Sequence, residues 1–215
     1  MKNSKKIQRM VGIASLAAIT AVLQVIANYI TFGPVSITLA LIPLVIGAIL
    51  YGPWAGAFLG ALMGAIILSA PSTAAFLAVN PFATVVLCLI KTGAAGLVSG
   101  FIFQALYKKN LSVAVIIATI AAPIVNTGLF AVGCMAFFMS TLEAWAGGSN
   151  AVGFLFLTMI GTNFLIEFAV NSILSPSVTY IVRVVSRNFH IGANFNAGAI
   201  YNEKELEEKA QLVTE

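Results

Sequence analysis

One lysine stands inside a long apolar stretch of the chain. Lys91 lies in the segment TVVLCLIKTGAAGLVSG, in which no other residue is charged. An ammonium group buried among apolar side chains is costly unless it is paired or hydrogen-bonded. Because it carries one positive charge and donates three hydrogen bonds, its natural partners are carboxylates, amides and polar ligands. Lys91 is therefore the first candidate for a binding residue.

Polar side chains in other apolar stretches could lie beside this lysine. Three of them are spaced four residues apart in one stretch and two in another, which places each set on one face of a helix. A further asparagine follows a proline in the segment APIVNTG. Amide side chains both donate and accept hydrogen bonds, as a site for a polar organic molecule requires. The predicted substrate-binding residues are Lys91, Asn126, Asn163, Glu167, Asn171, Asn28 and Gln24.

The lysine and the glutamate of this set allow three interpretations. Lys91 and Glu167 could form a structural ion pair that joins two helices, they could carry protons or ions, or they could orient a substrate in a pocket. The amides on several helices favour the pocket, and the sequence leaves the other two open.

The composition is that of an integral membrane protein. Hydrophobic residues make up 60% of the 215 residues, charged residues 8%, and the mean hydropathy is +1.01. Soluble domains carry about 25% charged residues. We predict an all-α membrane protein, a six-transmembrane-helix bundle formed by residues 1–187, followed by a polar cytoplasmic tail, 188–215. The predicted spans are about 8–30, 37–50, 54–69, 82–107, 113–139 and 152–185, each read against the roughly 20 residues that cross a bilayer.

The basic residues predict the orientation of these spans. They cluster before the first span, after the fourth and at the end of the sixth, and the other loops carry none. Cytoplasmic loops carry the Lys/Arg excess in membrane proteins. Both termini are therefore predicted to be cytoplasmic, the first span to be an uncleaved helix, and the charge of +4 to reflect topology and not nucleic-acid binding.

Small residues at four-residue spacing predict close helix packing. Glycines recur at positions 52, 56, 60 and 64 in the third predicted span. Such a stripe lets a neighbouring backbone approach closely. The first span carries a similar set, which could pack within the bundle or dock another membrane protein: Ala14, Ala17, Ala18 and Ala21.

Catalytic and metal-binding patterns are missing from the sequence. It contains no G-x-x-x-x-G-K-[ST] phosphate loop, no H-E-x-x-H and a single histidine, His190. Cys88 and Cys134 have no metal-site or disulfide spacing. We expect a protein that is not an enzyme and that needs no cofactor or metal.

Four segments together resemble the substrate-binding (S) components of energy-coupling factor transporters. They are ITLALIPLVIGAILYGPWAGAFLGALMGAI, NPFATVVLCLIKTGAAGLVSGFIF, AAPIVNTGLFAVGCMAFF and GTNFLIEFAVNSILSPSV, and they cover most of the chain from about residue 11 to 182. The likeness is greatest to the riboflavin- and pantothenate-type branch of the family.

The resemblance implies a vitamin-binding membrane protein of a prokaryotic plasma membrane that has no ATPase of its own. Its partners would be a transmembrane coupling subunit, docked on the four alanines above, and two cytoplasmic ATPase subunits. The loop TFGPVSIT would close over the pocket. Pantothenate is the favoured substrate, ahead of riboflavin, pyridoxine-type vitamins and pyrimidine precursors. The alternative is a stand-alone secondary transporter in which Lys91 and Glu167 exchange protons.

Overall fold

The chain folds into a bundle of helices with one small β-hairpin. The computed structural model describes residues 2–29, 31–32, 35–36 and 40–189. Its elements are α1 (Lys2–Tyr29), β1 (Thr31–Phe32), β2 (Val35–Ser36), α2 (Leu41–Tyr51), α3 (Pro53–Ile67), α4 (Pro71–Val79), α5 (Pro81–Leu106), α6 (Leu111–Phe137), α7 (Met139–Trp145), α8 (Ala151–Gly153), the π-helix η1 (Phe154–Gly161) and α9 (Thr162–Phe189).

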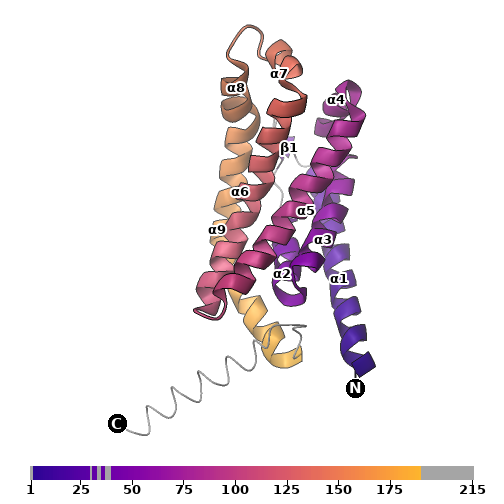
Figure 1. Cartoon of the computed structure of the whole chain (residues 1–215), viewed down its shortest axis with the longest axis vertical. Helices are drawn as coiled ribbons and strands as arrows, with labels where there is room; N and C mark the ends of the chain where they lie inside the picture. Colours follow the sequence, from indigo (N-terminus) through magenta and orange to yellow (C-terminus); the bar gives the residue numbers. More distant parts are fainter. Residues whose placement is uncertain (1, 30, 33–34, 37–39, 190–215) are drawn as a thin grey trace, which may run out of the picture.

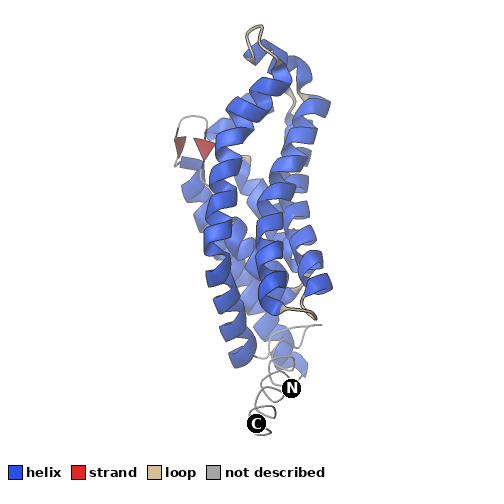
Figure 2. Cartoon of the chain, turned by 90° about the vertical axis from the view of Figure 1, so that its left-hand side faces the viewer, coloured by secondary structure: helices blue, strands red, loops and turns tan. Residues whose placement is uncertain are grey.

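The long helices run side by side along the molecule (Figure 1). The start of α1, the helix α2 and the end of α9 lie at one end, which we call the α2 end. The helices α4, α7 and α8 lie at the other, the α4 end. The antiparallel strands β1 and β2 pair Thr31 with Ser36 and Phe32 with Val35, and they lie at the side of the bundle in Figure 2.

Within the described residues, four helical segments are long and apolar enough to cross a membrane. They are Lys6–Tyr29, Pro81–Leu106, Leu111–Phe137 and Ala151–Val185. A fifth span results if α3 and α4, which meet at an angle of 84°, are taken as one broken span. The all-helical architecture is thus confirmed, whereas α2 alone is shorter than a bilayer-crossing helix.

The short helix α2 fills the centre of the bundle at its own end. It contacts α1, α3, α5, α6 and α9, and all of its residues except Ile42 are buried. A helix surrounded on every side needs no polar face, which explains why LIPLVIGAILY is apolar throughout. At the α2 end, Arg9 of α1 donates a hydrogen bond to the carbonyl oxygen of Tyr51 at 2.8 Å and so caps the last turn of α2.

Helices α3 and α5 touch backbone to backbone along a row of glycines, which we call the glycine seam: Gly56, Gly60 and Gly64 of α3, and Gly96 and Gly100 of α5. A Cβ atom on Gly56 would lie 2.6 Å from the carbonyl oxygen of Gly96, and one on Gly64 2.5 Å from that of Cys88. No side chain fits at these positions. The packing role predicted from the four-residue spacing is confirmed for Gly56, Gly60 and Gly64, while Gly52 serves the α2–α3 turn with a φ of 98°.

Asparagines and prolines begin several helices. The side-chain oxygens of Asn80, Asn110 and Asn150 accept hydrogen bonds from the first-turn N–H groups of α5, α6 and α8, which lack partners within the helix. Pro53 occupies the first turn of α3, as its fixed φ predicts.

Three segments differ from the sequence prediction. The segment predicted as the second external connection contains a helix, α4, which begins at Pro71, and the segment predicted as the third contains α7. The last predicted span is continued by α9 as far as Phe189 and includes a π-helical stretch, η1. The predicted tail from residue 190 onward lies outside the described residues.

Candidate functional site

A cavity of about 570 Å³ lies in the half of the molecule nearer the α4 end. Its walls come from the last turns of α1, α3 and α6, the first turns of α5, the helices α4 and α7, and the junction of η1 and α9. No residue of α2 lines it. The shortness of α2 therefore has a consequence for function: the helix fills the bundle only at the α2 end and leaves the space beyond it open.

Five of the seven predicted binding residues line this one cavity. They are Lys91, Asn126, Asn163, Gln24 and Asn28, and they come from four different helices. Glu167 and Asn171 do not line it, although both are buried in α9, with exposed fractions of 3% and 0%. The side-chain amide of Asn171 donates to the carbonyl oxygen of Glu167 at 2.8 Å, one turn back in the same helix.

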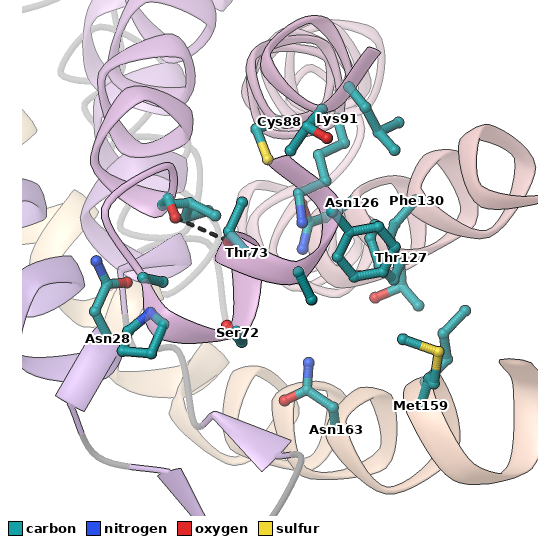
Figure 3. A pocket seen from close by; sticks show the side chains of 18 of the residues that line it. Asn28, Ser72, Thr73, Cys88, Lys91, Asn126, Thr127, Phe130, Met159 and Asn163 are labelled. Atoms are coloured by element: carbon teal, nitrogen blue, oxygen red, sulfur yellow. Dashed lines mark hydrogen bonds between the residues drawn. The ribbon is translucent and has the colours of Figure 1, made fainter. Parts of the chain in front are cut away.

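Lys91 points into the cavity from α5 and rests against an aromatic ring. Its Nζ lies 4.6 Å from the centre of the Phe130 ring of α6, within the range of a cation–π interaction. Figure 3 shows Lys91, Asn126 and Phe130 on one side of the pocket, with Asn28 on the other. The neighbouring Thr92 packs with its backbone carbonyl against Gly60, so the glycine seam fixes the turn of α5 that carries the lysine.

A hydrogen-bond network sets the orientation of the two α1 amides. The Asn28 Nδ2 donates to the carbonyl oxygen of Ile66 at 3.0 Å and to the Ser69 hydroxyl at 3.2 Å. A carbonyl can only accept, so Asn28 must turn its oxygen toward Gln24, whose Nε2 donates to it at 2.8 Å. The Gln24 oxygen is thereby left as an acceptor, and it has no partner among the described residues.

The amide oxygens of Asn126 and Asn163 resemble that of Gln24 in their surroundings. Both are buried, and neither has a hydrogen-bond partner in the described part of the chain. Asn126 follows Pro123, which interrupts the hydrogen-bond ladder inside α6. Buried polar groups without partners are rare in folded proteins and call for an explanation, such as a bound ligand.

An aromatic cluster that the sequence did not reveal closes the site toward the α4 end. The Phe76 ring of α4 meets Phe130, Phe138 and Trp145 edge to face, with ring centres 5.9, 5.2 and 5.3 Å away. All four rings line the cavity. The sequence held no signal for this cluster, because its rings come from separate elements: Phe76 from α4, Phe130 from α6, Phe138 from the α6–α7 junction and Trp145 from α7.

The four alanines predicted to dock a partner lie on α1 outside the cavity. Ala14 and Ala18 are exposed, and Ala17 and Ala21 are half-buried. Of the predicted lid TFGPVSIT, the strands β1 and β2 are described, and β2 contacts α1 and α9. Residues 33–34 and 37–39 lie outside the described residues.

A model of the family described as "ECF transporter, substrate-specific component" matches residues 8–179 of the chain. The chain belongs to this family. No curated protein matches it closely enough to name a relative. As an ECF substrate-specific component, the chain is a multi-pass membrane protein and a transporter subunit, of a kind that takes a small-molecule substrate and works with coupling and ATPase modules.

Proposed function

We propose that this S component is the high-affinity subunit of an ECF-type ABC importer, which captures a small water-soluble vitamin from outside the cell. The observation that carries the proposal is the 570 Å³ cavity, which is large enough for such a molecule and is lined by Lys91 and by amides from three other helices. Because the family supplies a substrate-specific subunit, a polar pocket in its interior is the natural place for the substrate.

The orientation and partners belong to the same proposal. Six spans, with α2 and α3 counted separately, place both termini in the cytoplasm of a prokaryotic cell and the α4 end outside. A transmembrane coupling subunit docks on α1 at Ala14, Ala17, Ala18 and Ala21, and two cytoplasmic ATPases drive uptake. The exposure of Ala14 and Ala18 supports this docking surface.

Among vitamins, pantothenate is favoured, which puts the chain in the riboflavin- and pantothenate-type branch. Its carboxylate suits Lys91, and its hydroxyl and amide groups suit the buried amides of the wall. Riboflavin, pyridoxine-type vitamins and pyrimidine precursors are the other candidates.

The test combines ligand identification with transport. The protein is purified from cells grown in rich medium, and the small molecule that accompanies it is identified by mass spectrometry. Uptake of that molecule is then measured in vesicles that contain the chain alone under a proton gradient, or the chain with coupling subunit, ATPases and ATP. We expect uptake only with the complete complex. Uptake by the chain alone under a proton gradient would instead support a secondary transporter that uses Lys91 and Glu167.

A further inference from the structure

We infer that the ligand of this cavity carries a single negative charge, that its anionic group binds Lys91, and that the Phe130 ring is the contact with which this group competes. The inference rests on the proposed function, since it assigns the chemical class of the molecule that the cavity takes. It separates the candidates: pantothenate and acidic pyrimidine precursors fit, whereas riboflavin and pyridoxine-type vitamins, which have no carboxylate, do not.

Charged side chains are scarce around the cavity. Among the described residues, Lys91 is the one charged side chain that lines the cavity; the other lining residues are apolar or aromatic, or are neutral amides, hydroxyls and a thiol. A charge taken out of water needs a compensating charge or several hydrogen bonds. The lining offers Lys91 no carboxylate, so a ligand with one negative charge makes the filled site neutral.

The rest of the chain has few acidic residues that could pair with Lys91. Of the seven acidic residues, five lie between positions 203 and 215, outside the described residues. The other two are Glu143, which is exposed on α7, and Glu167, and neither lines the cavity. Residues 30–39, between α1 and α2, contain no charged residue at all, so that connection cannot supply a counter-charge.

Lys91 contacts an aromatic ring inside the cavity. An aromatic face attracts a cation through its quadrupole, and this attraction is weaker than that of a desolvated carboxylate. At 4.6 Å from the Phe130 ring centre, the ammonium is held inside the cavity and ready for an anion. Phe130 is therefore a positioning residue that tunes how strongly the site prefers an anion.

The remaining walls define the rest of the ligand. Amides at Asn126, Asn163 and Gln24 present neutral hydrogen-bonding groups, and the aromatic cluster presents apolar surface. A second negative charge would find no cation, and burying an unpaired charge is strongly unfavourable. The class that fits is a small organic acid with one carboxylate, polar neutral groups and some apolar surface.

The experiment uses pairs of compounds that differ in the carboxylate. The pairs are pantothenate and pantothenol, nicotinate and nicotinamide, and orotate and uracil. Affinities for the purified, ligand-stripped full-length protein are measured by titration calorimetry at neutral pH. We expect at least one anion to bind more than about tenfold tighter than its neutral counterpart, which is the usual effect of one charge-assisted hydrogen bond.

Four variants locate the preference. Lys91→Met keeps an unbranched side chain, one atom shorter and without the charge, and should reduce the anion-to-neutral ratio to below about threefold, while Lys91→Arg should retain it. Phe130→Leu should raise the ratio roughly two- to fivefold, because the anion no longer competes with the ring. Glu167→Gln is the matched control and should leave the ratio unchanged within about twofold.

The anion assignment is overturned if no anion binds, if neutral compounds bind as tightly as their acids, or if Lys91→Met keeps the full preference. A rise of the ratio in Glu167→Gln of more than tenfold would make Glu167 the counter-charge of Lys91 and would overturn it as well. A neutral or cationic molecule that accompanies the protein and is taken up with the complete complex overturns the anion assignment while the proposed function stands. The absence of complex-dependent uptake overturns the proposed function itself.

Discussion

At the scale of single residues, the lining of the cavity includes polar atoms for which the described residues provide no partner. The oxygens of Gln24, Asn126 and Asn163 are buried without partners among the described residues, and Lys91 has an aromatic ring where a carboxylate would bind more strongly. Leaving a buried polar group unpaired costs about 1–3 kcal/mol of stability. Several unpaired polar groups around one cavity are best explained by a molecule that binds there and supplies their hydrogen bonds.

Asn126→Leu tests whether the unpaired amide lowers the stability of the protein and raises its affinity for the ligand. Leucine has nearly the shape of asparagine and no polar atoms, so the free energy of unfolding of the ligand-free protein should stay the same or rise by about 1 kcal/mol. Affinity for the ligand should fall roughly five- to tenfold, since one hydrogen bond is lost. Denaturant titration in detergent and calorimetry measure the two effects.

Thr20→Val is the matched control for this substitution. The Thr20 hydroxyl is buried on α1 and has no partner among the described residues, yet it does not line the cavity. We expect a similar small gain in stability and no change in affinity. If Asn126→Leu loses stability and keeps its affinity, then Asn126 is a structural residue.

The sequence allowed prediction of those binding residues whose polar side chains lie within apolar stretches. Lys91 and four amides stand out because their surroundings are apolar, and counting residues along each helix gave their depth. The aromatic residues could not be singled out in the same way. The chain has 15 phenylalanines, and nothing local distinguishes Phe76 and Phe130 from those that face lipid. The rotation of α9 about its own axis decides whether Glu167 lines the cavity. The spacing of residues within one helix does not determine this rotation.

At the scale of helices, the glycine seam is the contact that holds the lysine in place. The backbone carbonyls of Gly96, Thr92 and Cys88 lie where Cβ atoms on α3 would have to be. Close contact between helices maximises van der Waals packing, which is the main attraction between helices in a bilayer. The helix that carries Lys91 is therefore attached to α3 along much of its length.

Gly96→Ala and Gly93→Ala form a matched pair on α5. A Cβ on Gly96 would overlap the backbone of Gly56, which cannot move aside, so we expect a loss of roughly 1–3 kcal/mol in unfolding free energy. A Cβ on Gly93 would have its nearest neighbour at 3.6 Å, an ordinary contact. This variant should be as stable as the natural protein or gain about 0.5–1 kcal/mol from helix propensity. Thermal unfolding in detergent compares them.

Equal stability of the two glycine variants would mean that α3 and α5 do not pack through the seam.

The close packing of α3 could be predicted from the sequence, because small residues at four-residue spacing indicate it without any knowledge of the rest of the fold. Helix α4 and the π-helix η1 could not be predicted from the sequence. The stretch from Pro71 to Val79 is too short to show a helical period against an apolar background, and the 84° bend before it depends on hydrogen bonds from Asn28 and Thr73 to the end of α3.

At the scale of the whole molecule, the proposed orientation follows from charge. Lys108 and Lys109 are exposed in the α5–α6 turn, near the α2 end, where Arg9 also lies. The α7–α8 turn at the opposite end has no basic residue. The positive-inside rule then predicts that the α2 end lies in the cytoplasm and that the half of the molecule with the cavity lies on the outer side.

Cysteine labelling tests this orientation. In a background with Cys88→Ala and Cys134→Ala, single cysteines are introduced as Lys109→Cys and Ser149→Cys. A membrane-impermeant maleimide should label Ser149→Cys in intact cells and Lys109→Cys only in inverted membrane vesicles. The cysteine-free background controls for unspecific reaction. The reverse pattern would place the cavity on the cytoplasmic side and exclude capture from outside.

The glycine seam also bears on how such a protein could come to take a different substrate. The seam glycines of α3 and α5 face each other and not the cavity, and a larger residue at any of them would displace the helix that carries Lys91. On the side of η1 and α9, Met159, Ile160 and Asn163 face the cavity without such a constraint. New specificity can therefore arise by substitution on that wall while the lysine and its support stay intact, so that one scaffold could diversify among small organic acids.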